Sequence, residues 1–219
     1  MQPVIYYCYD AYCGWCYGFS PVIKKIAEEY KDTISFEVLS GGMIPSENPR
    51  PIATMASYIN DGYKRVQEMT GVKFGEDYLW HIHNADKSDW HPHSEKAAIA
   101  LCIFKEQYPE QQVAFAADLQ YALYFEGRDL TDNEAYRHLL EQYSINADDF
   151  YSKLKSEEYK DKVLYEFSLC RQLKVESFPQ VLIQVSEQKF HLIAKGYTDY
   201  DTLQKRIESV IGEIKSAAD

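Results

Sequence analysis

The sequence predicts an α/β fold in which two separate parts of the chain share one mixed sheet and an all-helical segment is inserted between them. Strand-like runs occur near the two ends of the chain, at residues 4–9 and 34–39 and again at 179–185 and 189–194. The long stretch between them repeats apolar residues at helical spacing and contains no convincing strand pattern. Each pair of strands has a helix of its own, so the chain reads β-α-β, then helices, then β-β-α.

The β-α-β part begins with a strand whose residues are mostly apolar or aromatic, Val4-Ile5-Tyr6-Tyr7-Cys8-Tyr9. Such a run is typical of a strand that is buried on both faces of a mainly parallel sheet. A helix follows over residues 19–30, and we expect Pro21 to kink it. The second strand, 34–39, ends at Gly41-Gly42, and a crossover of this kind is right-handed.

The run Asn48-Pro49-Arg50-Pro51 ends the strand pattern, and helical spacing follows it. Side chains suited to helix capping precede two of the later segments, at Thr131-Asp132 and at Asn146. The expected helices lie near 52–69, 94–108, 111–126, 132–142, 148–154 and 157–173. We therefore predict a discontinuous sheet domain, residues 1–48 and 165–219, and an inserted helical domain, residues 49–164.

The last part of the chain is a predicted hairpin followed by a helix. Residues 179–185 and 189–194 are two strands joined by a turn near Ser186-Glu187-Gln188. Residues 201–214 have the apolar spacing of an amphipathic helix. These elements complete the sheet that the first part of the chain begins.

The composition limits the partners of the protein. Its formal net charge is −11, which is unsuited to binding a nucleic-acid backbone, because that interaction needs clustered Lys and Arg. No apolar run is long enough to span a bilayer. The first residues show neither the basic segment nor the cleavage site of a signal peptide. We therefore expect a cytoplasmic protein with no nucleic-acid and no membrane partner.

The chain has five cysteines, of which Cys13 and Cys16 form a CxxC pair. An odd number of cysteines in a reducing compartment argues against a framework of structural disulfides. Cys8 lies within a predicted strand, and Cys102 and Cys170 lie within predicted helices. We interpret these three as small buried packing residues.

The pair Cys13-Gly14-Trp15-Cys16 comes shortly after a predicted strand and opens a predicted helix. The first turn of a helix has unpaired N–H groups and the positive end of the helix dipole, and both stabilise a thiolate. Thiols at such positions have pKa values of ~3.5–7.5, below the ordinary value of ~8.5. The thiolate is the attacking form in disulfide exchange. The second cysteine, one turn into the helix, is placed to close the disulfide.

Two metal-binding interpretations compete with the redox interpretation. A zinc site would need a second ligand pair, and the chain has no other CxxC. Cys8, Cys13 and Cys16 also have the C-x4-C-x2-C spacing that is seen in plant-type iron–sulfur proteins. Several histidines lie together in a stretch that reads as a polar loop, and we predict no metal there. They are His81, His83, His91 and His93.

The segment around the two cysteines resembles the active site of the DsbA family of thioredoxin-like oxidoreductases. Tyr9-Asp10-Ala11-Tyr12-Cys13-Gly14-Trp15-Cys16-Tyr17 is most similar to the FrnE-like branch, in which an Asp stands three residues before Cys-x-Trp-Cys-Tyr. Residues 94–132 resemble the inserted helical domain of that branch, and residues 173–179 resemble the segment with its cis-proline. The resemblance covers nearly the whole chain and implies a thioredoxin-like fold.

By this resemblance, Cys13 is the nucleophile and Cys16 is the resolving cysteine. Pro179 is the cis-proline that faces the disulfide, and the backbone of Phe178 before it pairs with an extended substrate. No cofactor is implied, because the two thiols carry the electrons, and glutathione would fit as a co-substrate. The residues expected to bind substrate are Gly14, Trp15, Phe178 and Pro179.

The sequence departs from the family pattern close to the cysteines. Gly14 stands where the FrnE-like branch usually has Pro. Tyr7 stands six residues before Cys13, where many thioredoxin-like proteins have a buried acid. Proton transfer to and from Cys16 must then use another group or water. Asp10 is the candidate proton relay, because it is close in sequence.

Three functions are compatible with these residues. Thiol–disulfide exchange on a protein or a small-thiol substrate is favoured, because both cysteines are present. The alternative is a glutathione-dependent isomerase or transferase of the same superfamily, such as the hydroxychromene-carboxylate isomerases, which usually have Ser in place of Cys13 and lack the second cysteine. The third is a metal or iron–sulfur protein. The cytoplasmic redox poise favours a reductase or isomerase over an oxidase; the substrate and the oligomeric state stay open.

Overall fold

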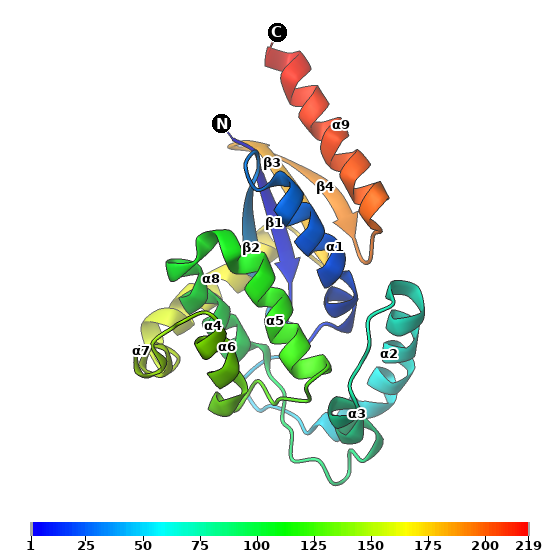
Figure 1. The fold of residues 1–219 in the computed structure, drawn as a ribbon, viewed down its shortest axis with the longest axis vertical. Helices are drawn as coiled ribbons and strands as arrows, with labels where there is room; N and C mark the ends of the chain where they lie inside the picture. The colour runs from blue at the N-terminus through cyan, green and yellow to red at the C-terminus, as the bar shows by residue number, and fades with distance from the viewer. Residues whose placement is uncertain (1, 219) are drawn as a thin grey trace.

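Four strands form one mixed sheet, as the sequence predicts. In the computed structural model, which describes residues 2–218, they run in the order β2-β1-β3-β4 (Figure 1). β1 (Val4–Tyr9) pairs parallel with β2 (Ser35–Ser40) and antiparallel with β3 (Gln180–Ser186). β3 also pairs antiparallel with β4 (Lys189–Lys195). The α/β class and the assembly of one sheet from both ends of the chain are therefore confirmed.

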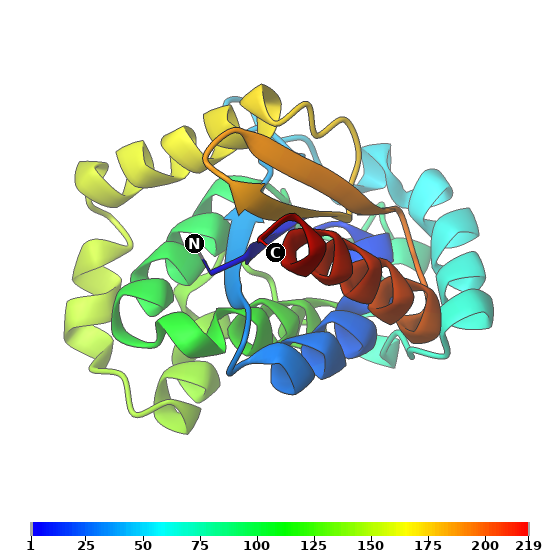
Figure 2. The same ribbon diagram turned by 90° about the horizontal axis from the view of Figure 1, so that it is seen from above.

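Helices cover both faces of the sheet: α1 (Gly14–Tyr30) and α9 (Tyr200–Ala218) on one face, α8 (Glu157–Gln172) on the other (Figure 2). The side chains of β1 alternate between these faces. The ring centroid of Tyr7 lies 5.9 Å from that of Phe19 in α1. Cys8 points the other way and shares a buried cluster with Cys170 of α8. Burial on both faces explains why the β1 sequence has no polar alternation.

The helix α1 begins at Gly14, earlier than the apolar spacing from Phe19 indicates. It continues through Pro21, which has no N–H to donate to the carbonyl oxygen of Tyr17. The hydroxyl of Ser20 donates to that oxygen instead, at 2.8 Å. The side chain before the proline thus satisfies the acceptor that the proline leaves free, and α1 is one continuous helix.

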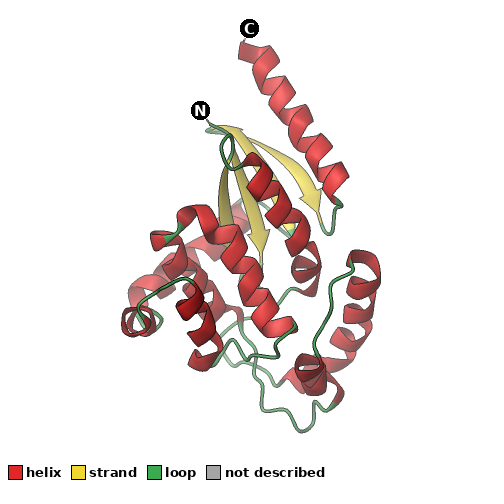
Figure 3. Ribbon diagram, viewed as in Figure 1, coloured by secondary structure: helices red, strands yellow, loops and turns green. Residues whose placement is uncertain are grey.

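The stretch between β2 and β3 is helical throughout its regular part, as predicted (Figure 3). Its helices are α2 (Ala56–Thr70), α3 (Glu76–His83), α4 (Ser94–Gln107), α5 (Gln112–Tyr124), α6 (Arg137–Gln142), α7 (Ala147–Lys153) and α8, with short 3-10 turns at Ile52–Thr54, Pro109–Gln111 and Asn133–Tyr136. The boundary predicted at residue 164 falls inside α8. The division into two domains therefore stays a prediction.

The capping residues predicted for this stretch lie at the starts of elements. The side chain of Asp132 accepts a hydrogen bond from the N–H of Glu134 at 3.2 Å, and that of Asn146 accepts one from Asp149 at 2.9 Å. Both contacts satisfy N–H groups that the first turn leaves unpaired. Among residues 2–218, no helix has the length and apolar composition needed to cross a membrane.

The prediction of a loop at His81 and His83 is wrong, because both residues lie in α3. This helix is short, and its buried residues are Tyr78 and Ile82. The ring of Tyr78 packs edge-on against Tyr124 of α5, with 5.0 Å between the centroids. Contacts with distant residues therefore stabilise a segment whose own apolar periodicity is weak.

Candidate active site

Cys13 is the residue that caps the N-terminus of α1. Its backbone is extended, with φ −88° and ψ 107°, and its Sγ accepts a hydrogen bond from the N–H of Cys16 at 3.3 Å. A sulfur in this position faces the unpaired N–H groups and the positive end of the helix dipole. The start of α1 therefore directs a backbone N–H and the positive end of the helix dipole at the Cys13 sulfur.

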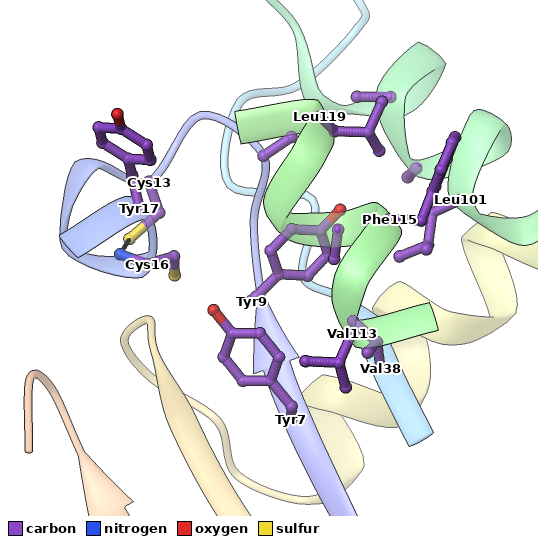
Figure 4. Packing of buried hydrophobic residues seen from close by; sticks show 14 of the residues in the cluster. Tyr7, Tyr9, Cys13, Cys16, Tyr17, Val38, Leu101, Val113, Phe115 and Leu119 are labelled. Atoms are coloured by element: carbon purple, nitrogen blue, oxygen red, sulfur yellow. Dashed lines mark hydrogen bonds between the residues drawn. The ribbon is translucent and has the colours of Figure 1, made fainter. Parts of the chain in front are cut away.

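Cys16 lies one turn further along α1 and has no exposed surface, whereas 6% of Cys13 remains exposed. Burial raises the pKa of the Cys16 thiol well above its usual value, and the neighbouring Cys13 thiol adds to this effect. The two sulfurs thus have unequal environments (Figure 4). Cys13 is the more accessible of the two, and Cys16 is a protonated thiol held behind it.

The segment just before β3 contacts Cys13. The peptide bond between Phe178 and Pro179 is cis, and the Cys13 thiol donates to the carbonyl oxygen of Phe178 at 3.4 Å. The carbonyl oxygen of Pro179 accepts a hydrogen bond from the N–H of Gly196 at 2.8 Å. Residues predicted from two distant motifs are therefore brought together at one sulfur atom.

The ring of Phe178 packs on the loop that follows β2. A β-carbon added to Gly41 would lie only 1.9 Å from Cζ of Phe178, so only glycine leaves room for the ring. The N–H of Gly41 donates to the carbonyl oxygen of Tyr9 at 2.8 Å, which fixes this loop to the end of β1. Gly41 is a residue of the site that sequence reasoning identified only as a strand end.

The carboxylate of Asp10 is buried and accepts three hydrogen bonds. The donors are the N–H of Tyr12 at 3.0 Å, the N–H of Met43 at 2.7 Å and the hydroxyl of Ser94 at 2.9 Å. Burial raises the pKa of Asp10, and these hydrogen bonds oppose the increase. Asp10 thus ties the turn before Cys13 to two other segments. Its role as a proton relay stays a prediction.

Gln120 of α5 holds the same turn from the helical stretch. Its Nε2 donates to the carbonyl oxygen of Asp10 at 3.1 Å and to that of Cys13 at 3.3 Å. Sequence reasoning missed Gln120 and Ser94, because neither belongs to a motif near the cysteines. The position of Ser94 as the first residue of α4 was the only local signal for either residue.

The dipeptide between the cysteines lies beside an aromatic cluster. A β-carbon at Gly14 would be 3.9 Å from Cζ of Phe74, which is ordinary contact. Phe74 packs edge-on against Tyr17, with 5.3 Å between the ring centroids. Trp15 is partly buried and packs against the main core. That Trp15 contacts the substrate stays a prediction.

The other cysteines and the histidines do not join this site. Cys8 lies on the face of the sheet opposite to α1, so the iron–sulfur spacing does not bring three sulfurs together. His81 stacks on Trp90, with 3.8 Å between centroids, and His91 contacts the carbonyl oxygen of Asp89. Within residues 2–218 there is no group of three or more His, Cys, Asp or Glu side chains arranged to hold a metal ion.

Several solved structures have the same fold as this chain. The chain resembles a Nitrosomonas europaea protein assigned as a protein disulfide isomerase, with a TM-score of 0.82 and 24% identity over 97% of this chain and 99% of that one. Cytosolic disulfide reductase DsbM from Pseudomonas aeruginosa has a TM-score of 0.76 and 22% sequence identity, and the match covers 95% of this chain and 98% of that one. A 2-hydroxychromene-2-carboxylate isomerase has a TM-score of 0.62 and 13% sequence identity, and the match covers 98% of this chain and 97% of that one.

These identities establish the fold alone, and no curated protein sequence matches the chain. The family model adds evidence from the sequence itself. The model for the DSBA-like thioredoxin domain matches residues 4–208, which include the CxxC pair, the helical stretch and the cis peptide bond. The chain therefore belongs to the family of DSBA-like thioredoxin domains.

Proposed function

We propose that this protein is a thiol–disulfide oxidoreductase that acts through Cys13 and Cys16. The observation that supports this most directly is the position of Cys13 Sγ, which caps α1 and contacts the carbonyl oxygen of Phe178. A thiolate there is stabilised by the helix start. The adjacent carbonyl oxygen is a backbone acceptor suited to an extended peptide that carries a disulfide.

The reaction transfers two electrons in two steps. The Cys13 thiolate attacks one sulfur of the substrate disulfide, a mixed disulfide forms, and the first substrate thiolate leaves and takes up a proton. The Cys16 thiol then loses its proton, and its sulfur attacks Cys13 Sγ. The mixed disulfide breaks, the Cys13–Cys16 disulfide forms, and the substrate has been reduced to two thiols. The reverse sequence oxidises a substrate.

We place the enzyme in the cytoplasm, in the FrnE-like branch, and expect it to act as a reductase or isomerase on protein or small-thiol disulfides. A reducing compartment keeps the Cys13–Cys16 pair in its dithiol form. A fold relative is described as a cytosolic disulfide reductase and is also known with glutathione, which supports glutathione as the co-substrate that returns electrons. No further cofactor is needed for this cycle.

The test combines three variants with a disulfide-bonded protein substrate. Cys16→Ser should accumulate a mixed disulfide at Cys13, because the resolving thiol is gone, and non-reducing gels with mass spectrometry would show it. Cys13→Ser should abolish exchange. Cys102→Ala, which removes a buried thiol of α4 far from the pair in sequence, should retain activity. Full activity of Cys13→Ser would show that the proposed function is wrong.

A glutathione-dependent isomerase or transferase is the second candidate. The fold likeness to the 2-hydroxychromene-2-carboxylate isomerase favours it, while the buried second thiol of Cys16 does not. Such an enzyme binds glutathione without consuming its electrons. If Cys16→Ser kept full activity and still required glutathione, this candidate would replace disulfide exchange.

A further inference from the structure

Tyr7 carries a hydroxyl group that is enclosed in the core without a partner. The side chain is 1% exposed, and its oxygen makes no hydrogen bond to any group in residues 2–218. A buried hydroxyl without a partner destabilises the fold relative to a phenylalanine of the same shape. A tyrosine at this position therefore lowers stability in a way that a phenylalanine would not.

The Tyr7 hydroxyl points toward Cys16 (Figure 4). Tyr9, two residues along the same strand, is also buried and also has an unpartnered hydroxyl, but that group points toward Leu119 of α5 (Figure 4). After the effect of burial, the groups that raise the pKa of Tyr7 most are the Cys16 and Cys13 sulfurs. The phenol therefore stays protonated at any working pH and is a permanent neutral donor.

Cys16 needs such a donor when it becomes a thiolate. The N–H of Cys16 is already directed at Cys13, and the Asp10 carboxylate, when charged, disfavours a second negative charge nearby. The backbone of Asp10 is the one neighbour among the main causes of this shift that lowers the pKa of Cys16. The titratable groups around Tyr7 and Cys16 are Cys13, Tyr9, Asp10 and Tyr124.

We propose that the hydroxyl of Tyr7 donates a hydrogen bond to the Cys16 sulfur and stabilises its thiolate during the resolving step. This inference rests on the proposed function. The proton of the Cys16 thiol leaves and ends on the departing substrate sulfur, the sulfur of Cys16 bonds to that of Cys13, and the bond between Cys13 and the substrate breaks. Tyr7 keeps its own proton throughout and acts as a donor only.

The two steps can be measured separately with the aryl disulfide dithiobis-nitrobenzoate. Attack by Cys13 releases one coloured thiolate, and resolution by Cys16 releases the second, so rapid mixing resolves the two rates. The variant is Tyr7→Phe, and the matched control is Tyr9→Phe. Each removes only a buried, unpartnered hydroxyl, so both variants should fold at least as well as the original chain.

We expect Tyr7→Phe to leave the first release unchanged and to shift the pH midpoint of the second upward by about one unit, which is the size of one charge-assisted hydrogen bond. Below that midpoint the second release should be about threefold slower, because a tenfold loss of thiolate is partly offset by its greater nucleophilicity. At pH values above the midpoint, the second release should be faster in Tyr7→Phe than in the original chain. A packing defect would slow the release at every pH, so it would not make the two pH profiles cross. Tyr9→Phe should change neither rate.

Two results would overturn the inference while leaving the proposed function intact. One is a second release in Tyr7→Phe with the same pH midpoint as the original chain, and the other is an equal shift in Tyr9→Phe. Titration of Cys16 alone by thiolate absorbance, with and without Tyr7→Phe in a Cys13→Ala background, gives an independent reading of the same pKa. Failure of the proposed function looks different, because the Cys13-dependent first release would then be missing in the original chain.

Discussion

Two identical side chains differ at this site because of their positions in one helical turn. Cys13 caps the helix and remains slightly exposed, whereas Cys16 is enclosed by the core. The helix start stabilises a negative charge on the first sulfur, and burial raises the pKa of the second. In the proposed function, this difference makes Cys13 the attacking thiol and Cys16 the resolving thiol.

Gly14 occupies the first position of α1, where proline is well tolerated. The extended backbone of Cys13 suits a following proline, and a β-carbon at residue 14 meets only Phe74 at contact distance. We expect Gly14→Pro to raise the free energy of unfolding by roughly 0.4–1 kcal/mol, because it restricts the unfolded chain. Chemical denaturation of the reduced protein measures this change.

Gly14→Ala is the control for the backbone at this position, because alanine keeps the N–H that proline removes. A change in the alkylation rate of Cys13 that occurs with proline and not with alanine would show that the N–H of residue 14 contributes to the thiolate. A loss of stability in Gly14→Pro would contradict the position of residue 14 in the first turn of α1.

The sequence predicted which residues meet at the site but not the contacts around them. The CxxC pair was recognisable from its spacing, and Pro179 from the resemblance of its segment to the DsbA family. Gln120 was not, because its hydrogen bonds to the turn before Cys13 depend on how α5 packs. No spacing in the chain encodes that contact.

Two loops meet beside Cys13, one after β2 and one before β3. The Phe178 ring lies against Gly41, and the carbonyl oxygen of the same Phe178 contacts the Cys13 sulfur. The β2 loop therefore sets the position of the backbone acceptor at the site. The strands β1 and β3 were predictable from their apolar runs and the helix α9 from its periodicity, whereas α3 and this loop contact depend on tertiary packing.

Replacing Gly41 with alanine should displace the Phe178 ring, because the new β-carbon would overlap Cζ. We expect disulfide exchange to slow by roughly tenfold to a hundredfold through misplacement of the Phe178 carbonyl, and stability to fall by about 1–3 kcal/mol from overpacking. Exchange rates with a peptide disulfide and denaturation curves measure these two effects.

Gly62→Ala is the matched control, since a β-carbon on that residue of α2 meets no atom within 4 Å. It should leave exchange unchanged and stabilise the helix by roughly 0.5–1 kcal/mol. Phe178→Ala added to Gly41→Ala should recover much of the lost stability. An unchanged exchange rate in Gly41→Ala would mean that this loop contact does not position the site.

The helical stretch is joined to the sheet along β2, the strand at its edge. The outward-facing polar groups of an edge strand need partners, and side chains from the helices supply them. Gln112 accepts from the N–H of Val38 at 2.7 Å and donates to the carbonyl oxygen of Phe36 at 2.7 Å. Glu166 of α8 accepts from the N–H of Ser40 at 3.0 Å. The helical stretch therefore also protects the sheet edge.

Lys105 of α4 is at the centre of this junction. Its ammonium group donates to Glu166 at 2.5 Å, to Glu37 at 2.8 Å and to the carbonyl oxygen of Val38 at 2.9 Å. Burial raises the pKa of Glu166, and the positive charge of Lys105 counteracts that effect. Removing the lysine would leave a buried carboxylate unpaired and raise its pKa further.

Lys105→Met should therefore lower the free energy of unfolding by about 3–5 kcal/mol near neutral pH. A carboxyl whose pKa is higher in the folded than in the unfolded state contributes stability at low pH that is lost as the pH rises through the folded pKa. The deficit of the variant should consequently shrink on acidification and grow as the pH rises above 4.5, the ordinary pKa of Glu. Denaturation curves at several pH values measure it.

Lys162→Met is the comparison for Lys105→Met, because Lys162 pairs with Glu106 and Glu158 at an exposed site. Exposed pairs contribute about 0–1 kcal/mol, so this variant should be nearly as stable as the original chain at every pH. Equal losses in the two variants, or a Lys105→Met deficit that does not change with pH, would contradict a buried ionic junction. A larger, pH-dependent loss in Lys105→Met alone would show that burial of Glu166 against β2 couples the helical stretch to the sheet.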